Sequence, residues 1–158
     1  MKIGQATDIH RLVENRPLIL GGVRIEYEKG LLGHSDADVL THAVAESIIG
    51  ALGLGDLGTH FPDTDPAYEG ISSLIILERV FEMMDAQGYR IGNVDATVMI
   101  EKPKLAAYKK QMEENLAAVL RCEPERINVK ATRGEGLGFI GRGEGVQAFS
   151  VCLLEEKE

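Results

Sequence analysis

Tryptophan is absent from the 158-residue sequence, and cysteine occurs only twice, as Cys122 and Cys152. Two cysteines so far apart match no metal-binding spacing, and a disulfide framework needs more of them. We therefore expect both to be reduced, partly buried thiols of a cytoplasmic protein.

Basic residues are in the minority, because 17 lysines and arginines face 25 aspartates and glutamates and leave a formal net charge of −8. This balance argues against a general nucleic-acid or membrane-surface binder, whose affinity comes from massed cations. No apolar run approaches the roughly 20 residues that span a bilayer, and the N-terminus lacks the apolar stretch and cleavage site of a signal peptide. We expect no nucleic-acid and no membrane partner, although a few local cations would suffice for a small anionic ligand.

What the sequence does contain is the material of one globular domain. Its residues are 44% hydrophobic and 27% charged, which is an ordinary composition, and the length is sufficient to bury a core. Because no repeat or linker interrupts the chain, we expect a single domain over residues 1–158.

Hydrophobic periodicity predicts a mixture of strands and helices. Strands are expected over 1–10, 93–101, 127–132 and 146–154, with a hairpin over 16–27. Helices are expected over 36–52 and 72–87, and a third after Pro103. Ser35 or Asp36 would cap the first helix, and Gly53 lies close to its end. The mixture of hairpins and crossovers favours an α+β fold, with a mixed sheet packed against helices.

Two glycine-bearing segments are predicted as loops. Residues 29–39 lead into the first helix, and residues 53–70 hold four glycines, three aspartates and two prolines. Leu57, Phe61 and Tyr68 in the second segment favour an ordered, functional loop.

The first candidate site is built on Asp8 and His10, which are two residues apart in an expected strand. Their side chains point to the same side of the strand and could reach one ion. His42 lies on a helix in a polar stripe with Asp38 and Glu46. One carboxylate and two imidazoles are a recurrent zinc ligand set that leaves a position open for substrate or water. Two ordinary semi-exposed histidines are the alternative, and periodicity alone does not bring residue 42 to residues 8 and 10.

The second candidate is "GHSDAD" at 33–38. His34 and Ser35 are expected at a helix N-terminus, where free N–H groups and the helix dipole favour an anion such as phosphate. The alternative is that Ser35 serves only as an N-cap.

The third candidate is the stretch 133–145, with six glycines in thirteen residues. Residues 136–141 match G-x-G-x-x-G literally, but no helical pattern follows, and the only later acidic residues in a suitable range belong to the charged tail at 155–158, so we reject a dinucleotide site. Its Arg133 and Arg142 suit phosphate oxygens, and Glu135 suits a hard divalent cation. A glycine-rich turn without a ligand is the alternative.

In this order and spacing, these stretches resemble one family over nearly the whole chain. They are "DIH" (8–10), "GHSDAD" (33–38) with His42, "GLGDLGTHFPDTDP" (53–66), "KPK" (102–104) and "VKAT…E…LGF…GRGEG" (129–145). The family is that of the 2-C-methyl-D-erythritol 2,4-cyclodiphosphate synthases, and "FPDTDP" and "GRGEG" are the most specific stretches. Its members act in the non-mevalonate route to isoprenoid precursors, where they close a CDP-linked methylerythritol 2-phosphate into a cyclic diphosphate and release CMP.

The resemblance implies a metal-dependent, cyclising phosphorus–oxygen lyase. Asp8, His10 and His42 would bind zinc, and Glu135 would bind a second divalent cation, Mg²⁺ or Mn²⁺. His34, Thr132 and Arg133 would take part in catalysis. The other implied substrate contacts are Ser35 with the methylerythritol phosphate; Asp56, Leu57, Gly58, Phe61, Asp63, Thr64 and Asp65 around the sugars; Ile100, Pro103, Lys104, Leu105 and Ala106 with cytosine; and Phe139 and Arg142 with the phosphates.

The resemblance also implies an assembly and a place in the cell. The family forms homotrimers with active sites between neighbouring subunits. We expect a cytoplasmic protein, or one of the plastid stroma in its mature form if the source bears plastids.

The chemistry that the resemblance implies requires no protein nucleophile, because the 2-phosphate attacks within the same molecule and catalysis depends on positioning and charge neutralisation.

Three departures from the family pattern lie close to the expected site residues. Ala37 replaces a usual glycine, Glu46 stands where aspartate is common, and Arg133 follows Thr132 where a second threonine is typical. Either a backbone N–H or the Arg133 guanidinium would then replace the missing threonine hydroxyl, or activity would be reduced. Two other functions remain open: a metal-dependent phosphohydrolase of nucleotide-diphosphate compounds, and a zinc-stabilised nucleotide-binding module without catalysis, which Arg133 makes more credible.

Overall fold

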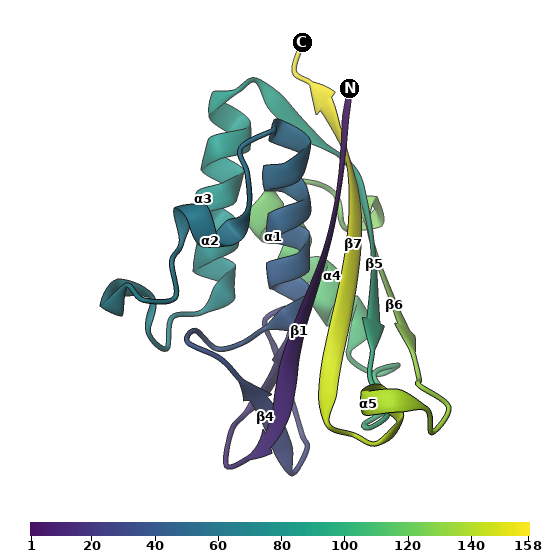
Figure 1. Ribbon diagram of the computed structural model, residues 1–158. Helices are drawn as coiled ribbons and strands as arrows, with labels where there is room; N and C mark the ends of the chain where they lie inside the picture. The colour runs from purple at the N-terminus through teal and green to yellow at the C-terminus, as the bar shows by residue number, and fades with distance from the viewer.

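A five-stranded mixed sheet forms one layer of the structure, a computed structural model that describes residues 1–158, and helices cover one face of the sheet (Figure 1). The strand order is β4-β1-β7-β5-β6, and only β5 and β6 run parallel. The strands are β1 (Lys2–Glu14), β4 (Lys29–Leu32), β5 (Tyr89–Met99), β6 (Ile127–Thr132) and β7 (Gly145–Glu156), and a separate hairpin comprises β2 (Leu18–Leu20) and β3 (Val23–Ile25). The predicted α+β fold with a mixed sheet against helices is confirmed.

The main helices are α1, α3 and α4, on the same side of the sheet (Figure 1). Their bounds are Val39–Leu52, Ser73–Ala86 and Lys109–Leu120. Short helices are α2 (Leu57–His60) and α5 (Gly138–Gly141), with 3₁₀ turns at Pro66–Tyr68 and Pro124–Arg126. Helix α1 is apolar nearly all round and is buried along most of its length, since it packs between the sheet and α3.

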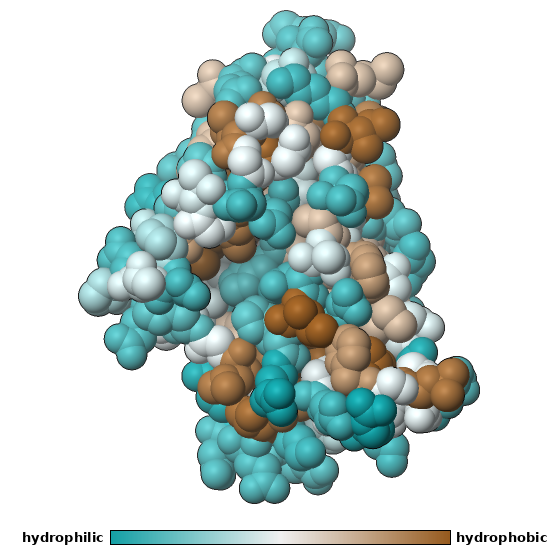
Figure 2. All heavy atoms as spheres, in the orientation of Figure 1, coloured by the Kyte–Doolittle hydropathy of each residue, from teal (hydrophilic) through white to brown (hydrophobic).

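The alternation of side chains along the strands places the core on the helical side of the sheet. Val94, Ala96 and Val98 of β5 are all buried there, as their spacing predicts. The other face of the sheet carries apolar side chains that no helix covers, namely Ile3, Ile9, Phe149 and Val151, which are between 40% and 73% exposed. Figure 2 shows hydrophobic patches over β1 and β7 among polar surface.

The start of α1 differs from the prediction. The helix begins at Val39 and not at residue 36, and its N-cap is Asp38, whose carboxylate accepts a hydrogen bond from Thr41 N at 3.0 Å. Ala37 has a φ of +58°, outside helical geometry, so the helix cannot extend back through it. The expected polar stripe is also wrong at Asp38, which is completely buried. Gly53 ends the helix in the left-handed conformation, as predicted.

Both predicted loops contain regular structure. Residues 29–32 form strand β4, which pairs with β1 at the edge of the sheet. Segment 53–70 contains α2 and a 3₁₀ turn, capped by Asp56 and Asp65. Strand β1 also extends to Glu14, beyond the predicted end. None of the helices combines the length and apolar character that crossing a membrane requires.

Candidate metal centre and substrate clefts

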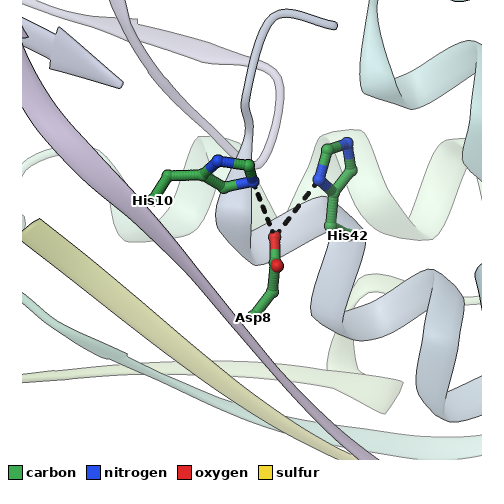
Figure 3. A group of neighbouring side chains, drawn as sticks. All are labelled: Asp8, His10 and His42. Atoms are coloured by element: carbon green, nitrogen blue, oxygen red, sulfur yellow. Dashed lines mark hydrogen bonds and ion pairs between the residues drawn. The ribbon is translucent and has the colours of Figure 1, made fainter. Parts of the chain in front are cut away.

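Strand β1 and helix α1 bring three side chains with metal-binding atoms together (Figure 3). Asp8 and His10 project from β1 toward α1, and His42 projects from the first half of α1. Asp8 Oδ2 lies 3.0 Å from His10 Nε2 and 3.2 Å from His42 Nδ1. All three ligand atoms lie within 4.8 Å of one another. The shared side of Asp8 and His10 was predictable from the strand, whereas the approach of His42 depends on the packing of α1 against β1.

The ring nitrogens of His10 show that this group fits a metal ion. His10 Nδ1 lies 2.9 Å from the carbonyl oxygen of Leu32, which can only accept, so this nitrogen carries the proton. His10 Nε2 is buried and has no hydrogen-bond partner, although Asp8 Oδ2 faces it. A buried nitrogen with a free lone pair beside a carboxylate suits a cation, and zinc binds this donor set readily.

The charges of the group act on one another. Burial raises the pKa of Asp8, but His10 and His42 lower it by more. The pKa of this carboxyl is therefore well below its ordinary value, and the group is ionised. Burial lowers the pKa of His10, and the Asp8 carboxylate beside it raises that pKa by more. The group is therefore an anion with two imidazoles around it, which favours an added positive charge.

A cleft of about 470 Å³ opens in front of the three side chains. Its lining includes many of the predicted substrate residues, since the loop of α2 forms the opposite wall. The lining residues are Asp8, His10, Gly33, His34, Ser35, His42, Glu46, Leu57, Gly58, Phe61, Pro62, Asp63, Tyr68 and Ile76. Glu46 does not join Asp8, His10 and His42, which we call the metal group. Its carboxylate accepts a hydrogen bond from Leu57 N at 3.1 Å and so holds the loop in place.

His34 and Ser35 do not lie at the N-terminus of α1, contrary to the prediction, because that helix begins at Val39. They line the cleft instead. His34 Nε2 lies 2.9 Å from the carbonyl oxygen of Asp65. This contact connects the wall of the cleft that carries His34 with the loop that forms the opposite wall. The Ser35 hydroxyl lies 3.2 Å from His42 Nε2.

Three other predicted residues of the 53–65 loop lie outside this lining. Asp56 and Asp65 act as caps of α2 and the 3₁₀ turn, with their carboxylates accepting from Thr59 N and Ala67 N, both at 2.9 Å. The hydrogen bonds from Thr59 lower the pKa of Asp56. Thr64 is exposed in a turn between α2 and the 3₁₀ turn.

A second, smaller cleft of about 210 Å³ lies where the parallel strands β5 and β6 end. It brings together all five residues predicted for cytosine with Thr132 and Arg133. Its lining comprises Ile100, Glu101, Pro103, Lys104, Leu105, Ala106, Lys109, Ala131, Thr132 and Arg133.

Glu101 is a residue of this cleft that sequence analysis missed. Its carboxylate accepts from Gly134 N at 2.8 Å and lies 3.5 Å from Arg133 Nη2, and its side chain is only 13% exposed. It therefore fixes the turn after β6 and the guanidinium together. The only signal in the sequence is a carboxylate placed between the end of a strand and Pro103.

The structure does not bring every predicted residue into these clefts. Glu135, Phe139 and Arg142 line neither of them, and Arg142 pairs with Glu144 at 2.7 Å. The two clefts share no residue. The first lies beside β1, which is next to the edge strand β4, and the second lies at the end of β6, which is the opposite edge strand of the sheet.

The fold and the site together define an α+β protein in which an Asp–His–His group that could hold a metal ion faces a polar cleft. The chain belongs to the YgbB family, whose sequence profile matches residues 1–155.

One curated relative and two solved structures are similar to nearly the whole chain. A protein of Geotalea uraniireducens called 2-C-methyl-D-erythritol 2,4-cyclodiphosphate synthase is 59% identical over 157 residues, which cover 99% of this chain and 100% of the relative. Among solved structures, the bifunctional IspDF from Campylobacter jejuni is 42% identical with a TM-score of 0.95, and the match covers 99% of this chain and 42% of that longer one. A CDP-bound 2C-methyl-D-erythritol-2,4-cyclodiphosphate synthase is 36% identical with a TM-score of 0.89, over 98% of this chain and 100% of the other. The family resemblance of the motifs is confirmed.

Proposed function

We propose that this chain converts 4-CDP-2-C-methyl-D-erythritol 2-phosphate into 2-C-methyl-D-erythritol 2,4-cyclodiphosphate and CMP, as a cyclising phosphorus–oxygen lyase of isoprenoid precursor synthesis. The observation that carries the proposal is the Asp8–His10–His42 group, held in an open cleft by a chain that matches relatives of that name over 99% of its length. The proposal treats residues 1–158 as one synthase domain. No observation favours the hydrolase or the binding module over it.

The metal site of this proposal uses Asp8, His10 and His42 as zinc ligands. The free lone pair of His10 Nε2 and the ionised Asp8 carboxylate support this assignment. Zinc, when bound, supplies a positive charge that polarises a phosphate oxygen. Glu135 would hold a second divalent cation, Mg²⁺ or Mn²⁺, because its carboxylate is exposed in the turn after β6 and free to take a hard ion.

The two clefts would hold the two ends of the substrate. The cleft beside the metal group would take the methylerythritol phosphate, with His34 and Ser35 at one wall and Asp63 at the other. The cleft at the end of β5 and β6 would take cytosine, largely through backbone groups, and Thr132 and Arg133 would face the phosphates. Five further residues would complete the substrate contacts from positions outside the lining of both clefts. They are Asp56, Thr64, Asp65, Phe139 and Arg142.

The reaction needs no protein nucleophile. An oxygen of the 2-phosphate attacks the β-phosphorus of the same molecule, and the bond from that phosphorus to the oxygen shared with CMP breaks. CMP leaves with the electron pair. The chain's task is to hold the ends of a flexible molecule together, for which effective molarities reach about 10⁵ M or more. The guanidinium of Arg133, 55% exposed beside the second cleft, would neutralise charge that builds up on the phosphates.

A homotrimer with active sites between subunits would join the two clefts. Within one chain they lie toward opposite edges of the sheet, so a second copy must bring the β6 end of its sheet to the metal cleft. The uncovered apolar side chains of β1 and β7 give such an assembly a surface to bury. A cytoplasmic location stays a prediction.

The test is incubation of the purified chain with the CDP-linked 2-phosphate substrate, followed by ³¹P NMR. We expect a cyclic diphosphate together with CMP, and loss of both after removal of metal with a chelator and recovery with zinc. His42→Ala should remain folded and release no CMP, whereas Arg79→Ala, at an exposed ion pair on α3 that lines neither cleft, should react normally. A linear phosphate product would indicate the hydrolase, and full turnover by the demetallated protein would overturn the metal assignment.

A further inference from the structure

We propose that Asp36 and Ser73 are positioning residues of the metal centre, which decide which ring nitrogen of His42 carries the proton. The inference rests on the metal site of the proposed function and extends it to two residues that have no role in the chemistry described above.

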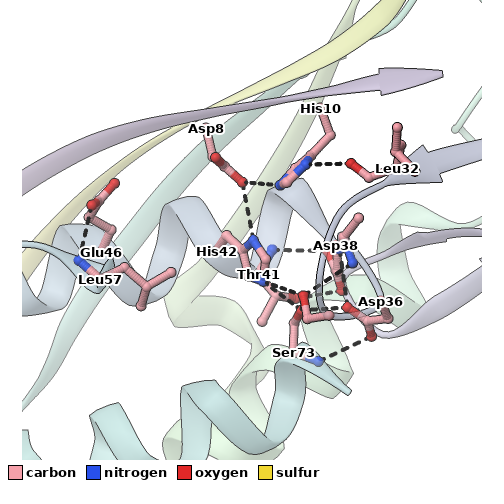
Figure 4. A network of polar contacts seen from close by, with 12 residues as sticks. Asp8, His10, Leu32, Asp36, Asp38, Thr41, His42, Glu46, Leu57 and Ser73 are labelled. Atoms are coloured by element: carbon pink, nitrogen blue, oxygen red, sulfur yellow. Dashed lines mark hydrogen bonds and ion pairs between the residues drawn. The ribbon is translucent and has the colours of Figure 1, made fainter. Parts of the chain in front are cut away.

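A chain of contacts leads from the metal group to a carboxylate behind it (Figure 4). His42 Nδ1 faces Asp8, and the other ring nitrogen, Nε2, lies 2.7 Å from Ser73 Oγ. The Ser73 hydroxyl also makes a short hydrogen bond to Asp36 Oδ1. Ser73 is completely buried, so water does not compete for these contacts.

The direction of these hydrogen bonds follows from the chemistry of the groups. An ionised carboxylate can only accept, so the Ser73 proton goes to Asp36. The Ser73 oxygen then offers His42 a lone pair and no proton. A neutral His42 has one ring proton for two acceptors, Ser73 Oγ at 2.7 Å from Nε2 and Asp8 Oδ2 at 3.2 Å from Nδ1. The closer acceptor favours the proton on Nε2, which leaves the Nδ1 lone pair toward Asp8 and the metal.

Asp36 is itself fixed in the accepting state. Its Oδ2 accepts from Ser73 N and its Oδ1 accepts from Asp38 N, both at 3.1 Å. Two backbone N–H groups and one hydroxyl thus point at this carboxylate. Rotation of the Ser73 proton toward His42 would leave this partly buried carboxylate short of a donor, which is unfavourable.

Ser35 is the competing partner of His42, and the distances favour Ser73. Ser35 Oγ lies 3.2 Å from Nε2, longer than the contact with Ser73, and it accepts from Ala37 N. Its hydroxyl is bonded to no carboxylate that would fix its direction. Ser73 is therefore the partner that determines the tautomer.

His10 shows the same device in a simpler form, since the Leu32 carbonyl fixes its proton on Nδ1. Both imidazoles thus present a free nitrogen to the same point before any metal arrives. Such partners of metal-bound histidines typically raise metal affinity by about 10- to 100-fold.

The chain offers a matched pair of serines for the experiment. Ser73→Ala removes the hydroxyl behind His42, whereas Ser72→Ala removes the neighbouring hydroxyl, which caps the same helix by accepting from Leu74 N. Zinc affinity is measured by competition with a chromogenic chelator, after circular dichroism has shown that both variants are folded. We expect Ser73→Ala to weaken zinc binding by about 10- to 100-fold and Ser72→Ala to leave it unchanged.

A second measurement needs no variant. The ¹⁵N NMR shifts of the His42 ring in the metal-free protein, at a pH where it is neutral, report which nitrogen is protonated. We expect the proton on Nε2 in the wild type and a mixture of tautomers in Ser73→Ala. A proton on Nδ1 in the wild type, or equal zinc affinities of wild type and Ser73→Ala, overturns the inference alone. Failure of the wild type to bind zinc overturns the metal centre as well.

Discussion

Replacing Ala37 by glycine should leave the free energy of unfolding nearly unchanged, although Ala37 is completely buried. Its φ of +58° lies in the left-handed region, where a side chain costs about 1–2 kcal/mol. Glycine relieves that strain. Against this relief stand the lost burial of one methyl group, about 0.8 kcal/mol, and the greater freedom of glycine in the unfolded chain, about 0.4–1 kcal/mol. The contributions cancel to within about 1 kcal/mol.

The matched control is Ala43→Gly. Ala43 is equally buried but lies inside α1, with helical backbone geometry and no strain to relieve. There the methyl group and the poor helix propensity of glycine add to about 1.5–2 kcal/mol of destabilisation.

Both variants are compared by urea unfolding, followed by far-UV circular dichroism at one fixed protein concentration, since association would shift the midpoint. If Ala37→Gly destabilises the protein as much as Ala43→Gly, the left-handed conformation at position 37 carries no strain and the reasoning is refuted.

Three further predictions address other features. Asp38→Asn should lower the free energy of unfolding by about 3 kcal/mol in the same urea assay. Four hydrogen-bond donors converge on this buried carboxylate, and an amide can accept at only one of its two positions, so an unchanged free energy of unfolding would refute this reasoning. Arg133→Met should lower kcat for CMP release about 100-fold, whereas Arg90→Met, paired with Glu155 outside both clefts, should not; equal rates would exclude the guanidinium from catalysis. Burial raises the pKa of Cys122 to about 11, so iodoacetamide should label it slowly near neutral pH and about tenfold faster for each unit of pH up to that value; a plateau below about pH 9 would contradict the shift.

Local patterns predicted those parts of the fold that depend on local rules. The bounds of β6 agree with the prediction, and Val94, Ala96 and Val98 are buried together because alternation along a strand is independent of what packs on it. Strand β4 was missed because Gly30 makes its segment look like a loop. In the structure a Cβ at Gly30 would clash with the carbonyls of Arg16 and Pro17, so the glycine permits a close approach of two backbones.

The start of α1 could not be chosen locally. The prediction placed the N-cap at Ser35 or Asp36, but Asp38 is an equally good N-cap residue, and local rules do not rank the three. The structure selects Asp38 because Gly21 N and Gly22 N, in the distant hairpin turn, donate to its carboxylate at 2.9 and 2.8 Å. A contact across 16 or 17 residues leaves no trace in local periodicity. For the same reason, the metal group was incomplete until the family resemblance added His42.

The segment 36–38 links the stability of the fold to the metal centre. Asp36 and Asp38 are two residues apart, yet the first carboxylate bonds to Ser73 behind His42 and the second to the hairpin and the first turn of α1. If Ala37 had helical or extended backbone geometry, it would fix the directions of the two carboxylates relative to each other. They could then not reach Ser73 and the hairpin turn at the same time. The left-handed backbone at Ala37 turns the chain between them, so each carboxylate meets its own set of donors. One aspartate therefore anchors the helix that carries His42, while the other orients its imidazole, and the strain at Ala37 is the local cost of joining these tasks in three residues.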